Sequence, residues 1–115
     1  MLDLKQCNPD LLNDLIYIKE SMISAAETVN AHIVGESFHQ FHPQGVTGVL
    51  SIAESHICIH TWPEYGYAAA DIFTCGTSVH PRVAAMCLIE KLESKDPVIT
   101  EFARGFEASV ILGSA

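Results

Sequence analysis

The chain has 115 residues, of which 49% are hydrophobic and 17% are charged, and its formal net charge is −8. This length and composition predict a single globular domain over residues 1–115 and exclude a disordered chain. The negative charge argues against a nucleic-acid partner, because phosphates are bound by clusters of Lys and Arg. No apolar run reaches the roughly 18 residues that cross a membrane, and no signal-peptide pattern opens the sequence. We therefore expect a cytoplasmic protein without a membrane partner.

The predicted elements are a strand, a helix, four strands, a second helix and two final strands. Asn8 is a preferred N-cap and Pro9 suits the first helical turn, so a helix begins there. Apolar residues at helical spacing extend it to residue 29. A second helix begins at Pro81. The predicted strands are residues 2–6, 31–41, 46–52, 56–62, 67–74, 97–103 and 106–112.

This order predicts an α+β fold. Consecutive strands joined by short turns pair antiparallel, which gives an antiparallel sheet with both helices on one face. The other face would then expose Val, Ile and Ala, and an apolar face of that size needs a partner. We expect a second copy to cover it, so that a homodimer forms an αββα sandwich with the layers helix, sheet, sheet, helix.

Residues 53–67 hold the densest group of reactive side chains, and a metal site is one interpretation of them. In a regular strand His56, Cys58 and His60 share one face, and His39 and His42 lie nearby in sequence. His and Cys are good zinc ligands. However, alternation crowds three ligands onto one strand and no fourth ligand is evident. Ordinary hydrogen-bonded histidines explain the pattern more simply, so we expect no metal site.

A second interpretation is hydrolysis by Ser55 or Cys75 with a histidine base. The Gly-x-Ser-x-Gly pattern is absent, and neither residue has another local signature of a nucleophile. The cysteines show no Cys-x-x-Cys pair, which predicts free thiols that pack as small apolar residues. They are Cys7, Cys58, Cys75 and Cys87.

A third interpretation rests on three blocks taken together: Glu54-Ser55-His56, residues 59–69 (IHTWPEYGYAA) and residues 71–76 (DIFTCG). They resemble the core of the prokaryotic S-adenosylmethionine decarboxylase proenzymes, which cleave themselves and depend on a pyruvoyl group. The resemblance extends more weakly from about Cys7 to Gly105. Family members usually carry Gly-x-His-Leu before the first strand, and this sequence starts at or after that point. We therefore expect a shortened first strand.

The resemblance implies self-cleavage between Glu54 and Ser55, giving a β chain of residues 1–54 and an α chain of residues 55–115. Ser55 would become the pyruvoyl group, which forms a Schiff base with the substrate amine and accepts electrons as carbon dioxide leaves. The implied reaction decarboxylates S-adenosylmethionine to the aminopropyl donor of polyamine (spermidine) biosynthesis.

The same resemblance assigns roles to further residues. His60 matches the proton acceptor of self-processing, and Thr47 takes the place of a nearby hydroxyl that is usually a serine. Cys75 matches the proton donor of decarboxylation, which suits a thiol because thiols are largely protonated at pH 7.

The substrate-binding residues implied are Glu64, which would accept hydrogen bonds from the ribose hydroxyls, and Phe41 and Trp62, which would line the nucleoside pocket. The alternative interpretation of Glu64 is a solvated turn residue, and that of Phe41 and Trp62 is ordinary core packing, which explains Trp62 equally well. Two alternatives remain open: the same pyruvoyl chemistry on arginine or ornithine, and an unprocessed regulatory homologue that pairs with an active subunit.

Overall fold

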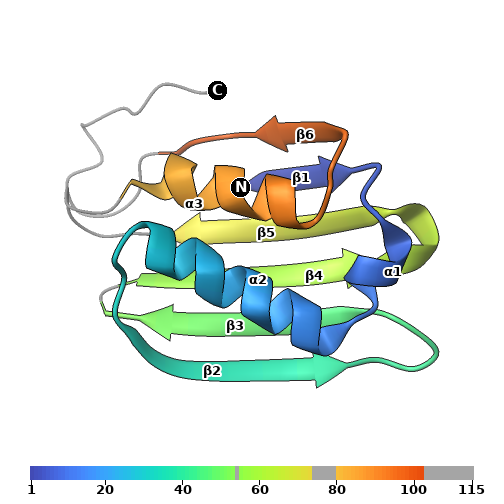
Figure 1. The fold of residues 1–115 in the computed structure, drawn as a ribbon, viewed down its shortest axis with the longest axis horizontal. Coiled ribbons are helices and arrows are strands. Elements are labelled where there is room, and N and C mark those ends of the chain that lie inside the picture. The colour runs from blue at the N-terminus through green and yellow to red at the C-terminus, as the bar shows by residue number, and fades with distance from the viewer. Residues whose placement is uncertain (54, 74–79, 103–115) are drawn as a thin grey trace.

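The computed structural model describes residues 1–53, 55–73 and 80–102. Their strands form one antiparallel sheet in the order β2-β3-β4-β5-β1-β6 (Figure 1). The strands are β1 (Leu2–Lys5), β2 (Ile33–Gln40), β3 (Val46–Ile52), β4 (Ser55–Trp62), β5 (Tyr67–Phe73) and β6 (Asp96–Ile99). The α+β antiparallel fold predicted from the sequence is confirmed. The strand predicted at residues 106–112 lies outside the described residues.

The first predicted helix is two helices. Helix α1 (Pro9–Leu12) follows the Asn8 cap as predicted, but a second cap ends the continuity: the Asp14 side chain accepts a hydrogen bond of 3.0 Å from the Tyr17 backbone N–H. Helix α2 (Leu15–Thr28) begins there. The prediction of one helix over residues 9–29 is therefore wrong at positions 13 and 14. Helix α3 (Pro81–Lys91) starts as predicted.

The core lies between the helices and one face of the sheet (Figure 1). Alternate residues of β3 and β4, such as Leu50, Ile57 and Ile59, are fully buried and belong to the same core cluster as Ile18 and Met22 of α2. Burial of such side chains is worth about 1.5–3 kcal/mol each. The helices therefore cover the aliphatic face.

The opposite face, named the open face below, is mostly polar. Cross-strand pairing sets Thr47, His60, Ala69 and Asp3 in one row across β3, β4, β5 and β1. The expectation that Val, Ile and Ala dominate this face is wrong, because alternation places large aliphatic side chains of the central strands, such as Leu50, Ile57 and Ile59, under the helices. Hydrophobic cover alone therefore gives no reason for a partner on this face.

One close approach between neighbouring strands shapes the sheet. A Cβ at Gly48 would overlap the ring of Phe38, its cross-strand partner on β2, so only glycine leaves room for that ring. β1 lies between β5 and β6 and is not an edge strand.

In the part of the chain that the structure describes, no helix has the length and hydrophobicity needed to cross a membrane.

Candidate active site

Five of the predicted site residues line one pocket at the end of the sheet where β3 begins and β4 ends. This pocket, named the His60 pocket, has a volume of about 440 Å³. Its lining residues are Phe41, Gln44, Gly45, Thr47, His60, Thr61, Trp62 and Glu64. The sequence motifs therefore gather in space.

Thr47 and His60 form the polar centre of the pocket. They are cross-strand partners on β3 and β4, and Thr47 Oγ1 and His60 Nδ1 share a hydrogen bond of 2.8 Å. This contact orients the imidazole ring through Nδ1, and Thr47 makes no hydrogen bond to Nε2. The arrangement suits a histidine that takes up a proton.

Aromatic rings form the walls. The Trp62 ring lies 6.2 Å from the His60 ring and stacks on Tyr67 at 5.3 Å. Phe41 packs edge-on against His39 at 4.5 Å. Phe41 and Trp62 remain 46% and 38% exposed, far from the burial of core aromatics. Flat, accessible ring faces of this kind can hold a planar base or a cationic group.

Glu64 lies at the pocket rim on the short 3-10 helix η1 (Pro63–Tyr65). Pro63 opens that turn, and Gly66 ends it with a φ of 59°, a left-handed conformation that favours glycine. The turn holds an exposed carboxylate beside the aromatic walls. Such a group can accept two hydrogen bonds from neighbouring hydroxyls.

Thr61 is a buried pocket residue that sequence reasoning missed. Its Oγ1 donates to the Leu12 carbonyl at 2.7 Å and accepts from the Val46 N–H at 2.8 Å, which ties β4 to α1 and to the start of β3. Asn13 similarly accepts hydrogen bonds from the Gly45 N–H at 2.9 Å and from the Gln40 side chain at 3.0 Å. These polar contacts fix the pocket rim, and hydrophobic patterning gives no signal for them.

The structure does not bring Ser55 to this pocket within one chain. Ser55 is the first residue of β4 and pairs with Ile52, the last residue of β3. His60 lies five positions further along β4, which corresponds to about 16 Å and to the opposite face of the strand. Its hydroxyl lies 3.5 Å from the Ala53 carbonyl. Glu54 and Cys75 lie outside the described residues.

Residues 1–105 match the family model described as S-adenosylmethionine decarboxylase. The chain belongs to the S-adenosylmethionine decarboxylase family. The resemblance inferred from the sequence blocks is thereby confirmed.

Alignments with relatives in this family extend over most of the chain. S-adenosylmethionine decarboxylase proenzyme from Thermodesulfovibrio yellowstonii is 50% identical over 105 residues, covering 91% of this chain and 78% of its own. The proenzyme from Moorella thermoacetica is 50% identical over 99 residues, covering 86% and 79%. The crystal structure of the adenosylmethionine decarboxylase from Aquifex aeolicus aligns with a TM-score of 0.78 at 34% identity, covering 84% of this chain and 79% of that one.

The side chains considered for a metal site have other contacts in this family member. His56 stacks on Phe73 at 5.4 Å, and among the described residues no three His, Cys, Asp or Glu side chains are grouped closely enough to hold a metal ion. Burial, followed by the nearby charge of Asp71, raises the pKa of the Cys58 thiol. A thiol held protonated is a poor nucleophile.

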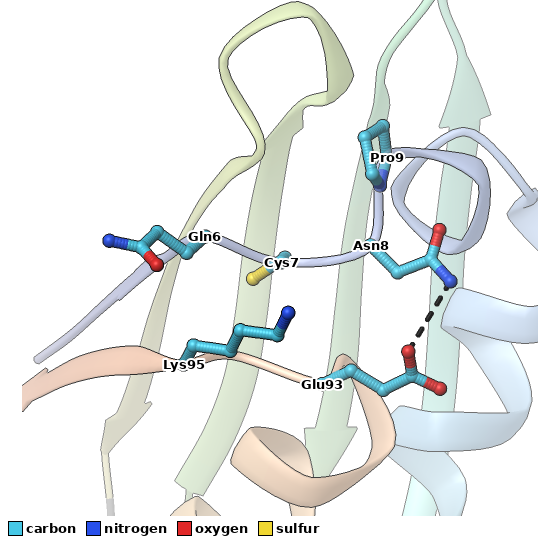
Figure 2. A pocket seen from close by; sticks show the side chains of 6 residues that line it. All are labelled: Gln6, Cys7, Asn8, Pro9, Glu93 and Lys95. Carbon is cyan, nitrogen blue, oxygen red and sulfur yellow. Dashed lines mark hydrogen bonds between the residues drawn. The ribbon is translucent and has the colours of Figure 1, made fainter.

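A second, smaller pocket of about 240 Å³ lies where the β1–α1 and α3–β6 connections meet (Figure 2). The Asn8 side chain donates a hydrogen bond of 3.3 Å to the Glu93 carboxylate, and Cys7 is one of the residues that line the pocket. Burial raises the pKa of the Cys7 thiol, so this cysteine is also not a thiolate at neutral pH. None of the predicted site residues lines this pocket.

Proposed function

We propose that the chain cleaves itself between Glu54 and Ser55, converts Ser55 into a pyruvoyl group and decarboxylates S-adenosylmethionine. The observation that carries this proposal is the His60 pocket, because its lining includes five side chains to which the family resemblance assigns roles in substrate binding or processing. Membership of the family makes the product the aminopropyl donor of polyamine biosynthesis.

Self-cleavage needs no outside reagent but water. The Ser55 hydroxyl attacks the carbonyl carbon of residue 54, the C–N bond breaks, and an ester with a free amine replaces the peptide. Loss of the residue-54 carboxylate leaves a dehydroalanine, and its hydrolysis releases ammonia and leaves the pyruvoyl end. His60 would accept the proton that Ser55 loses during processing. Thr47 would hold the imidazole ring in place through the 2.8 Å hydrogen bond between the two residues.

The position of Ser55 fits this conversion. It is the first residue of β4, so a break before it leaves every β3–β4 pair from Ile52–Ser55 onward in place. The two products would remain interlocked, because β1 of the first chain lies between β5 and β6 of the second. The pyruvoyl group would supply a carbonyl that binds the substrate amine and withdraws electrons from the bond to the departing carboxylate.

The His60 pocket suits an adenosyl sulfonium. Glu64 can accept hydrogen bonds from both ribose hydroxyls, and the faces of Phe41 and Trp62 can hold the adenine or attract the cationic sulfur. Among the residues that the structure describes, no Lys or Arg lines the pocket, which favours a cationic ligand. We propose that Cys75 returns a proton to the substrate carbon after decarboxylation.

The roughly 16 Å between Ser55 and His60 in one chain is too long for proton transfer, which requires about 3 Å. We propose a homodimer in which the open faces pack together about a two-fold axis that lies between the two sheets, opposite the middle of β4 and at a right angle to that strand. Such an axis would place the Ser55 end of each sheet beside the partner's pocket. Each site would then take Ser55 from one copy and His60 from the other.

The substrate is tested by release of carbon dioxide from carboxyl-labelled S-adenosylmethionine, arginine and ornithine. We expect release from S-adenosylmethionine alone, and none from a folded Ser55→Ala variant. Release from arginine or ornithine in preference to S-adenosylmethionine would overturn the substrate assignment.

A further inference from the structure

Behind the Trp62 wall of the His60 pocket lies a pair of side chains with no assigned role. Tyr67, the first residue of β5, is the cross-strand partner of Trp62, and their rings stack at 5.3 Å with an interplanar angle of 30°. The Tyr67 hydroxyl donates a hydrogen bond to the carboxylate of Asp3 on β1. Three neighbouring strands thus contribute one row of contacts that ends at the pocket.

The Tyr67 hydroxyl donates to a carboxylate, and hydrogen bonds to carboxylates are stronger than those between neutral groups. Its hydrogen bond to Asp3, followed by burial and the charges of Asp3 and Asp71, raises the pKa of Tyr67 to about 12. The phenol therefore stays protonated and continues to donate throughout the physiological range.

This bond is not needed to hold the strands together. β1 already pairs with β5 through Leu2, Asp3 and Leu4 and with β6 on its other side. Neither Asp3 nor Tyr67 belongs to the buried core. What the bond determines is the direction of the phenol ring, and the Trp62 ring lies against that phenol.

We propose that Asp3 and Tyr67 are positioning residues for the pocket: the Asp3 carboxylate fixes the Tyr67 ring, which holds Trp62 in the orientation that lines the His60 pocket. Neither residue touches the reacting atoms. The consequence for substrate binding rests on the proposed function, whereas the orientation of Trp62 does not.

The chain supplies its own reporter, because Trp62 is its single tryptophan. The test compares tryptophan emission and acrylamide quenching in uncleaved Ser55→Ala protein carrying Tyr67→Phe or Asp3→Asn. Tyr67→Phe retains the ring and removes only the hydroxyl. The matched control is Tyr17→Phe, which removes a hydroxyl that donates to the Lys91 carbonyl at 2.6 Å on the helical side.

We expect both pocket variants to shift the emission to longer wavelength and to increase the quenching constant, while Tyr17→Phe leaves both unchanged. Unchanged emission and quenching in folded Tyr67→Phe and Asp3→Asn would overturn the proposal. A shift of equal size in the control would also overturn it, because the effect would then reflect general loosening.

A second readout uses enzyme with Ser55 intact. Tyr67→Phe should raise KM for S-adenosylmethionine by about 2- to 12-fold, with kcat nearly unchanged. This factor corresponds to the loss of the contact between the Trp62 ring and the substrate. A fall in kcat with KM unchanged would contradict a positioning role in binding. If wild type shows no decarboxylation while the fluorescence shifts appear, the proposed function fails and the orientation of Trp62 by this pair stands.

Discussion

Complementation between two inactive variants tests whether the active site is shared between copies. Ser55→Ala lacks the nucleophile, and His60→Ala lacks the proposed base. In a mixed dimer one site would combine the intact Ser55 of the His60→Ala chain with the intact His60 of the Ser55→Ala chain. That site should process, whereas each variant alone should remain uncleaved.

The geometry sets the size of the effect. Within one chain about 16 Å separates Ser55 from His60, so rearrangement of a side chain cannot bridge the gap. With equal expression and random pairing, about half of the dimers are mixed in a two-fold assembly. About half of the His60→Ala chains should therefore be cleaved, and none of the Ser55→Ala chains.

The assay is intact-mass analysis after co-expression, with a different affinity tag on each variant. Purification through both tags in sequence isolates the mixed dimers and confirms that they exist. Mixed dimers in which the His60→Ala chain stays uncleaved would refute a site shared between copies. Failure of the two tags to copurify would refute the dimer itself.

Three further changes probe the pocket and the sheet. Glu64→Gln should raise KM for S-adenosylmethionine by about 10- to 100-fold, as expected for a lost hydrogen bond to a charged acceptor, while Glu93→Gln in the second pocket leaves KM unchanged; equal effects would contradict the ribose role. Gly48→Ala should destabilise the fold by about 1–3 kcal/mol in urea unfolding through overlap with Phe38, and a Phe38→Ala background should remove that cost; an additive double variant would contradict this packing. Folding raises the pKa of Tyr67 from 10.0 to about 12, so its hydrogen bond should stabilise the fold below pH 10 and lose that effect as the pH rises through about 12. If the unfolding midpoint of Tyr67→Phe falls with pH in this range as steeply as that of the wild type, Tyr67 is not the group responsible.

Much of the fold follows from local pattern. The apolar run from Val46 to Ile52 predicts the strand, and Pro81 marks the start of α3. The break between α1 and α2 was missed because Leu11 and Leu15 continue the helical spacing across it. The cap at Asp14 that ends this continuity depends on one polar side chain.

The candidate site also combines residues that the sequence predicts with contacts that only the structure reveals. The family resemblance pointed to Thr47, His60 and Glu64, and the register of β3 and β4 then explains why the first two meet. The Asp3–Tyr67 contact joins residues 64 positions apart, and its discovery required the order of strands in the sheet. The polar character of the open face was also missed, because it depends on which alternate residues the helices cover.

Self-cleavage at Ser55 is tested by the intact mass of the purified protein under denaturing conditions. We expect two chains, residues 1–54 and 55–115, with the second lighter by one ammonia than the same fragment with a free serine end. Ser55→Ala should give one uncleaved chain. A wild-type protein that stays at full mass after long incubation, or a second chain that begins with free serine, would show that no pyruvoyl group forms from Ser55.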